Sequence, residues 1–159
     1  MAATLYPSII QTTLNTLLSA ILPGIPKRVK ISLTSAQILA LNSTPILCVA
    51  APGTGYFIRV LRASAMIIEG DSSAYATHEQ LDLYTATGLP QASTLSTFLN
   101  PSGAGAGDSR RQYFNDTVAL DDEDVLLSNA ALYVTVPGGN PTAGDGTVML
   151  YITYEIIAL

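Results

Sequence analysis

The apolar residues of this chain are spread through short, alternating segments, and turns rich in Gly, Pro, Asn and Asp separate these segments. An alternation with a period of two is typical of β-strands that have one buried face. No stretch stays apolar over the roughly 18 residues that a transmembrane helix needs. The pattern therefore predicts an all-β protein, and no membrane is expected as a partner.

Turn signals divide the chain into short β segments. Strands are expected over 29–33, 45–50, 56–69, 112–120, 129–136 and 147–157, with one or two more between 75 and 84. Short helices are expected over 34–41 and 92–99. The last strand is apolar on both faces, which predicts a central place in a sheet or a place at an interface. About eight strands without strand–helix–strand units predict an antiparallel β-sandwich, most simply a jelly roll.

The start of the chain differs from the rest, because no charged side chain precedes Lys27. Four apolar residues spaced four, three and four apart form a seam of the coiled-coil kind: Ile10, Leu14, Leu17 and Ile21. The predicted organisation is an N-terminal helical arm over 1–26 and a β-sandwich domain over 27–159. Three interpretations of the arm stay open, namely docking on its own domain, contact with another subunit or partner, and a disordered arm.

The chain has few charges, since only 12% of its residues are Asp, Glu, Lys or Arg, against about 25% in a typical soluble domain. Charged side chains normally cover a surface, so this shortage predicts that neighbouring protein chains cover much of it. The net charge of −5 argues against a nucleic-acid partner, because binding phosphates requires a basic surface. The small basic cluster of Lys27, Arg28 and Lys30, which begins just ahead of the first expected strand, can still pair with an acidic partner surface.

No set of residues points to catalysis. Cys48, the only cysteine, lies in an apolar run and is expected to be a small buried hydrophobe. His78 is the only histidine and has no neighbouring metal-ligating residues in the sequence. Glu69 and Asp71 flank a glycine, as the paired carboxylates of a glycosidase could. Glycosidases line their sugar clefts with aromatic rings, however, and this sequence has no tryptophan. We expect neither a metal nor another cofactor, and we do not expect an enzyme.

Two further segments are considered as candidate ligand-binding loops. Asp121–Asp124 is a run of four acidic residues. It is expected to be a solvated turn, with a Ca²⁺ site and a contact to a basic partner as the alternatives. Gly103–Asp108 is rich in glycine, but it lacks the Lys and Ser or Thr of a phosphate-binding loop. This segment is expected to be a surface loop.

Two parts of the sequence carry a resemblance. Residues 31–45, ISLTSAQILALNSTP, lead into 49–56, VAAPGTGY. Near the other end, 140–147, NPTAGDGT, precede an alternating strand that closes with YEII at 154–157. These segments resemble small virion proteins of tailed bacteriophages, over roughly 29–68 and 132–157.

The resemblance implies a jelly-roll module that acts as a capsid decoration, or cement, protein. Such a protein would sit as a homotrimer on the capsid surface and bind the major capsid protein, with no catalytic residues. Similar proteins belong to tails or fibres, so a receptor-binding module that recognises host-surface glycans is the alternative. The expected assembly contacts are the arm residues Ile10, Leu14, Leu17 and Ile21 together with Tyr151 and Tyr154 of the last strand. For the two tyrosines, core packing is the other interpretation.

Overall fold

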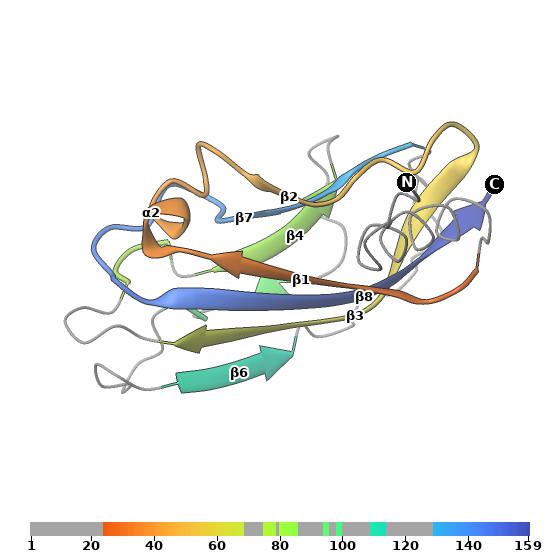
Figure 1. The fold of residues 1–159 in the computed structure, drawn as a ribbon. Coiled ribbons are helices and arrows are strands. Elements are labelled where there is room, and N and C mark those ends of the chain that lie inside the picture. The colour runs from red at the N-terminus through yellow and green to blue at the C-terminus, as the bar shows by residue number, and fades with distance from the viewer. Residues whose placement is uncertain are drawn as a thin grey trace, which may run out of the picture.

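The computed structural model describes residues 24–68, 75–78, 80–85, 94–95, 98–99, 109–113 and 129–159. Within these ranges the chain forms two antiparallel sheets of four strands each, with one short helix (Figure 1). The first sheet has the order β1 (Lys27–Leu33), β8 (Thr147–Ala158), β3 (Tyr56–Ile68) and β6 (Ser109–Tyr113). The second has the order β2 (Ile46–Val49), β7 (Leu132–Thr135), β4 (Leu81–Thr85) and β5 (Thr94–Leu95). The prediction of an all-β protein is confirmed.

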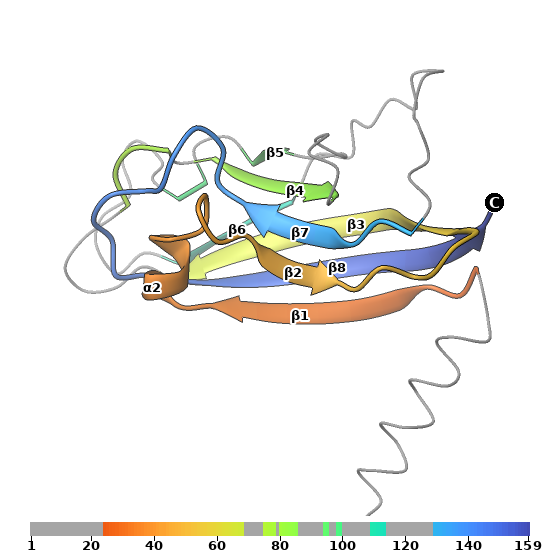
Figure 2. The same cartoon turned by 90° about the horizontal axis from the view of Figure 1, so that it is seen from above.

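The strand pairs are nested along the chain. β1 pairs with β8, β2 with β7, β3 with β6 and β4 with β5. β8 also pairs with β3, and β7 with β4, so that these pairs join into sheets. Strands from the two ends of the sequence therefore lie side by side, and Figure 2 shows the two sheets as two layers.

The last strand is central, as its apolar character predicted, because it lies between β1 and β3. Its residues Val148, Leu150 and Ile152 are buried in alternation with half-buried neighbours. This period of two is what a strand with one face on a core shows. The outward residues of β8 are consequently available to form a surface.

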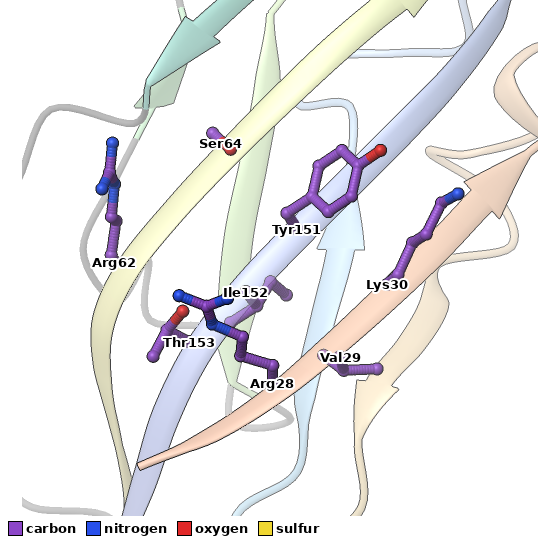
Figure 3. Close-up of a pocket in the computed structure, with 8 residues that line it drawn as sticks. All are labelled: Arg28, Val29, Lys30, Arg62, Ser64, Tyr151, Ile152 and Thr153. Atoms are coloured by element: carbon purple, nitrogen blue, oxygen red, sulfur yellow. The ribbon is translucent and has the colours of Figure 1, made fainter.

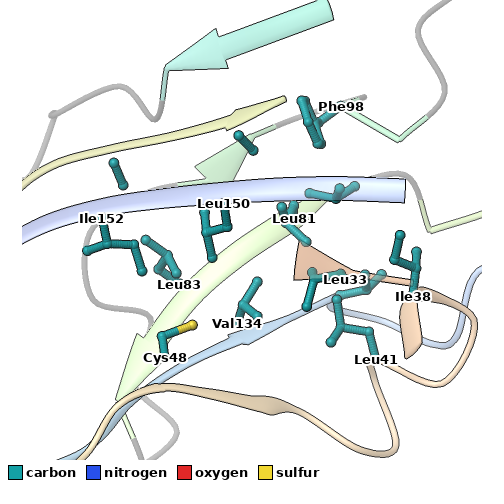
Figure 4. Packing of buried hydrophobic residues seen from close by; sticks show 14 of the residues in the cluster. Leu33, Ile38, Leu41, Cys48, Leu81, Leu83, Phe98, Val134, Leu150 and Ile152 are labelled. Carbon is teal, nitrogen blue, oxygen red and sulfur yellow. The ribbon is translucent and has the colours of Figure 1, made fainter. Parts of the chain in front are cut away.

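The core lies between the two sheets, and residues from both supply it (Figure 4). Leu33, Leu150 and Ile152 enter it from the first sheet, and Leu83 and Val134 enter it from the second. Each fully buried side chain of this size contributes roughly 1.5–3 kcal/mol through removal from water. Because the two sheets bury their inner faces against each other, any contact with solvent or a partner involves their outward faces.

The helix α2 (Ser35–Ile38) follows β1 and closes one end of the core with Ile38. Thr34 and Gln37 cap it reciprocally: the Gln37 amide N–H donates to the Thr34 hydroxyl over 3.3 Å. In return, the Thr34 amide N–H donates to Gln37 Oε1 over 2.9 Å. This capping box starts the helix where the sequence predicts it, although the expected helix over 34–41 is shorter in the structure.

Two expectations about local structure are wrong. The expected helix over 92–99 is not formed at its centre, because Thr94 and Leu95 pair with Asp82 and Leu81 of β4. Backbone hydrogen bonds to an open strand edge outweigh local helix propensity there. The basic cluster that was expected to begin ahead of the first strand lies within β1, which begins at Lys27.

Some expectations fall outside the described residues. The arm over 1–26 is described only from Gly24 onward, so the helix and its four seam residues are untested. The strand expected over 112–120 begins earlier, at Ser109, and is described as far as Tyr113.

Candidate interaction surfaces

The outward side of the first sheet carries two rows of polar side chains. In register, Arg28 of β1 and Arg62 of β3 both pair with Thr153 of β8. One step along the strands, Lys30 of β1 and Ser64 of β3 both pair with Tyr151 of β8. Residues that pair across strands lie on the same face. Leu33 of β1 is buried in the core and Val29 packs against it, so Arg28 and Lys30 face outward.

Arg62 reaches this face through a register shift in β3. Arg59 pairs with Glu155 and Arg62 pairs with Thr153, and the register shifts between Val60 and Arg62. In a regular strand, residues three apart point to opposite faces. The shift adds one residue on β3, so that Arg59 and Arg62 share the outward face.

The two rows surround a hollow of about 480 Å³ (Figure 3). Its outward lining is polar and consists of Arg28, Lys30, Arg62, Ser64, Tyr151 and Thr153. In Figure 3, Arg28 extends from β1 towards Thr153 on β8. The Lys30 amine lies over the Tyr151 ring, 5.7 Å from its centroid. This ring is therefore already in contact with a cation, an arrangement that stabilises Lys30 at the surface.

Ser64 forms part of the floor of this hollow and is only 7% exposed. Among the residues that the structure describes, its hydroxyl has no hydrogen-bond partner. Buried hydroxyl groups normally find a partner. A ligand that carries acceptor oxygens would provide one.

Among the described residues, positive charge dominates this surface, which we call the cationic face and define by Arg28, Lys30 and Arg62. The one carboxylate that the described part of the sheet adds to its outward side is Glu155, and it forms an ion pair with Arg59. No ion pair within the described ranges involves Arg28 or Lys30. A cationic face on a chain of net charge −5 favours a partner with negative charge.

A second surface lies where β8 ends. Ile25, Tyr56 and Leu159 are 47%, 38% and 62% exposed. Backbone hydrogen bonds place them at the same end of the sheet, because Gly24 bonds to Ile156 over 2.7 Å and Leu159 to Gly55 over 2.9 Å. We call Ile25, Tyr56 and Leu159 the apolar end. Exposed apolar residues that gather in one place mark protein contacts more often than scattered ones do.

The two tyrosines predicted as assembly contacts lie on opposite sides of β8. Tyr151 lines the hollow on the cationic face. Tyr154 packs against the core cluster, and burial raises the pKa of its phenol. Core packing therefore describes Tyr154, whereas the assembly role of either residue stays a prediction, as does that of the arm residues.

The sequence interpretation missed Arg62 and Ser64. The alternation in β1 could place Arg28 and Lys30 on one face, but nothing in the sequence indicated the register shift that brings β3 into line with them.

Of the residues considered for catalysis or metal binding, only Cys48 and His78 lie in the described ranges. Cys48 is buried in the core, and burial raises the pKa of its thiol to about 12, so it is protonated at neutral pH. This confirms that Cys48 is a small buried hydrophobe. His78 lies in a loop, while Glu69, Asp71, 103–108 and Asp121–Asp124 lie outside the described residues.

Within the described ranges, no three His, Cys, Asp or Glu side chains are close enough to hold a metal ion. In the same ranges, no helix has the length and the apolar character that crossing a membrane requires.

Comparison of the sequence with known protein families and with curated proteins gives no match.

Proposed function

We propose that this chain is a structural virion protein: a capsid decoration protein with a jelly-roll fold that binds the major capsid protein as a homotrimer at the capsid surface. The resemblance of 31–56 and 140–157 to small virion proteins of tailed bacteriophages suggests this role. The nested pairing of the strands supports the jelly roll, because that fold winds eight antiparallel strands into two Greek keys.

The observation that carries the proposal is the apolar end. A chain of 159 residues is long enough to bury most of its apolar side chains alone. Three large apolar side chains nevertheless remain exposed at the same end of the first sheet, near the start of β1. Contact with neighbouring subunits or with the shell would cover them. Such contacts add buried interface and stabilise a shell without any chemical step.

The oligomeric state tests this proposal. For the full-length protein at micromolar concentration, light scattering or native mass spectrometry is expected to give three times the 16.7 kDa mass of one chain. The double variant Tyr56→Ser, Leu159→Ser is expected to shift the protein towards the monomer. Leu47→Ser is the matched control, because Leu47 is 50% exposed and lies on β2 of the second sheet. A wild-type monomer would contradict the homotrimer.

Labelling of phage particles tests the place in the virion. Antibody against the protein, viewed by negative-stain microscopy, is expected to decorate the head. Label confined to the tail would instead favour a receptor-binding module that recognises host-surface glycans.

A further inference from the structure

The cationic face carries an inference that rests on the proposed homo-oligomer and identifies one of its contacts. We infer that the cationic face of one subunit binds the acidic run Asp121–Asp124 of a neighbouring copy of the same chain. The face and the run are different surfaces, so this contact is head-to-tail and repeats around the symmetry axis until the ring closes.

Charge is the first argument. The described ion pairs leave Arg28 and Lys30 without a carboxylate partner. The sequence places four of its twelve acidic residues in the single run Asp121–Asp124. Each copy therefore offers both a cationic face and the most acidic segment of the sequence. Pairing them would offset the repulsion between subunits of net charge −5.

Spacing is the second argument. Arg28 and Lys30 are two residues apart on one face of a strand, where side chains repeat every 6.6–6.8 Å or so. A neighbouring segment docked in extended form repeats its side chains at the same interval. Two alternate carboxylates of the run, either Asp121 and Glu123 or Asp122 and Asp124, would then match Arg28 and Lys30 one to one.

The hollow is the third argument. The buried Ser64 hydroxyl lacks a partner in the described part of the chain, and it lies beside Tyr151 and Thr153 in register. A carboxylate that enters the hollow would accept a hydrogen bond from Ser64. The Lys30 amine lies 5.7 Å from the centroid of the Tyr151 ring, and the described lining adds no second aromatic ring on which a sugar could stack. An acidic segment therefore fits the hollow better than a glycan does.

The test reverses charges on the face and on the run in the full-length chain and then measures the mass of the oligomer in solution. Arg28→Glu with Lys30→Glu is expected to weaken the oligomer at least tenfold in dissociation constant. Adding either Asp121→Lys with Glu123→Lys or Asp122→Lys with Asp124→Lys is expected to restore it, and only one of these pairs should do so. The control is Lys27→Glu, because Lys27 adjoins Arg28 on β1 but pairs with Tyr154, on the other side of the strand.

Ionic strength adds a second measurement. The screening length falls from about 10 Å at 0.1 M salt to about 3 Å at 1 M. The wild-type oligomer is expected to weaken over this range, and the Arg28→Glu, Lys30→Glu variant is expected to respond less.

The outcomes separate this inference from the proposed function. A trimer that Arg28→Glu, Lys30→Glu leaves intact would overturn the inference and leave the proposed function standing. Loss of stability in the run variants without any change of mass would overturn it as well, because the run would then bind its own subunit. If the wild type is monomeric, the proposed function fails. The inferred contact then fails with it, because it requires a neighbouring copy of the chain.

Discussion

Gly144 shows how one residue without a side chain permits the packing of another. Its backbone has φ +97°, and a Cβ atom there would lie 2.3 Å from Cδ1 of Tyr75. Tyr75 is 1% exposed, and its hydroxyl donates to the Gly146 carbonyl over 2.7 Å. Tyr75 is thus fixed at both its ring and its hydroxyl. It cannot move aside without losing a buried hydrogen bond.

Gly144→Ala is therefore expected to lower the free energy of unfolding by about 1–2 kcal/mol for backbone strain and by a further 1–3 kcal/mol or so for overpacking. Gly53→Ala is the control, since Gly53 has φ +107° but no atom within 4 Å of its added Cβ. Urea unfolding of both variants measures the difference. Equal losses of unfolding free energy in the two variants would mean that the Tyr75 ring moves aside without a measurable cost.

The element α2 depends on a capping box that the sequence already displays. Thr34→Ala removes the hydroxyl that accepts from the Gln37 amide, and we expect a loss of about 1 kcal/mol in the free energy of unfolding. Thr34→Ser keeps the hydroxyl and should retain most of this stability. Urea unfolding measures both variants. A serine variant as unstable as the alanine variant would show that the methyl group, not the cap, is what matters.

The elements that local signals specify were predictable. α2 has its cap within four residues, and β8 shows its central place through apolar residues on both faces. β5 was not predictable in this way. Thr94 and Leu95 are a strand only because β4 presents an open edge to them, and that edge is formed by residues distant in the sequence.

The same reasoning explains what the sequence revealed of the surfaces. Lys27, Arg28 and Lys30 are neighbours in the sequence, so their cluster was visible as a possible contact with an acidic partner. Arg62 joins Arg28 only through strand pairing across β8 and through the register shift in β3. Strand order and register are properties of the whole sheet, so this half of the cationic face required the structure.

At the scale of the whole molecule, burial of acidic hydroxyl and thiol groups ties stability to pH. Burial raises the pKa of the Cys48 thiol from 9.0 to about 12. Burial also raises the pKa of the Tyr154 phenol and, with a further contribution from Tyr133, that of Tyr84. Burial lowers the pKa of Lys27, which acts in the opposite direction. Among the described residues, the thiol and the two phenols outnumber this one amine.

Because the folded state holds these protons more tightly than the unfolded state, their contribution to stability is complete below pH 9 and is lost as the pH rises towards 12. We therefore expect the free energy of unfolding, measured with urea in the presence of a reductant, to fall across this range. Cys48→Ala removes one titrating group, so its curve should be shallower by up to about 1.4 kcal/mol per pH unit. The comparison concerns slopes, because the smaller side chain lowers stability at every pH. Parallel curves for the two proteins between pH 9 and 12 would show that the thiol of the folded protein ionises as readily as that of the unfolded chain.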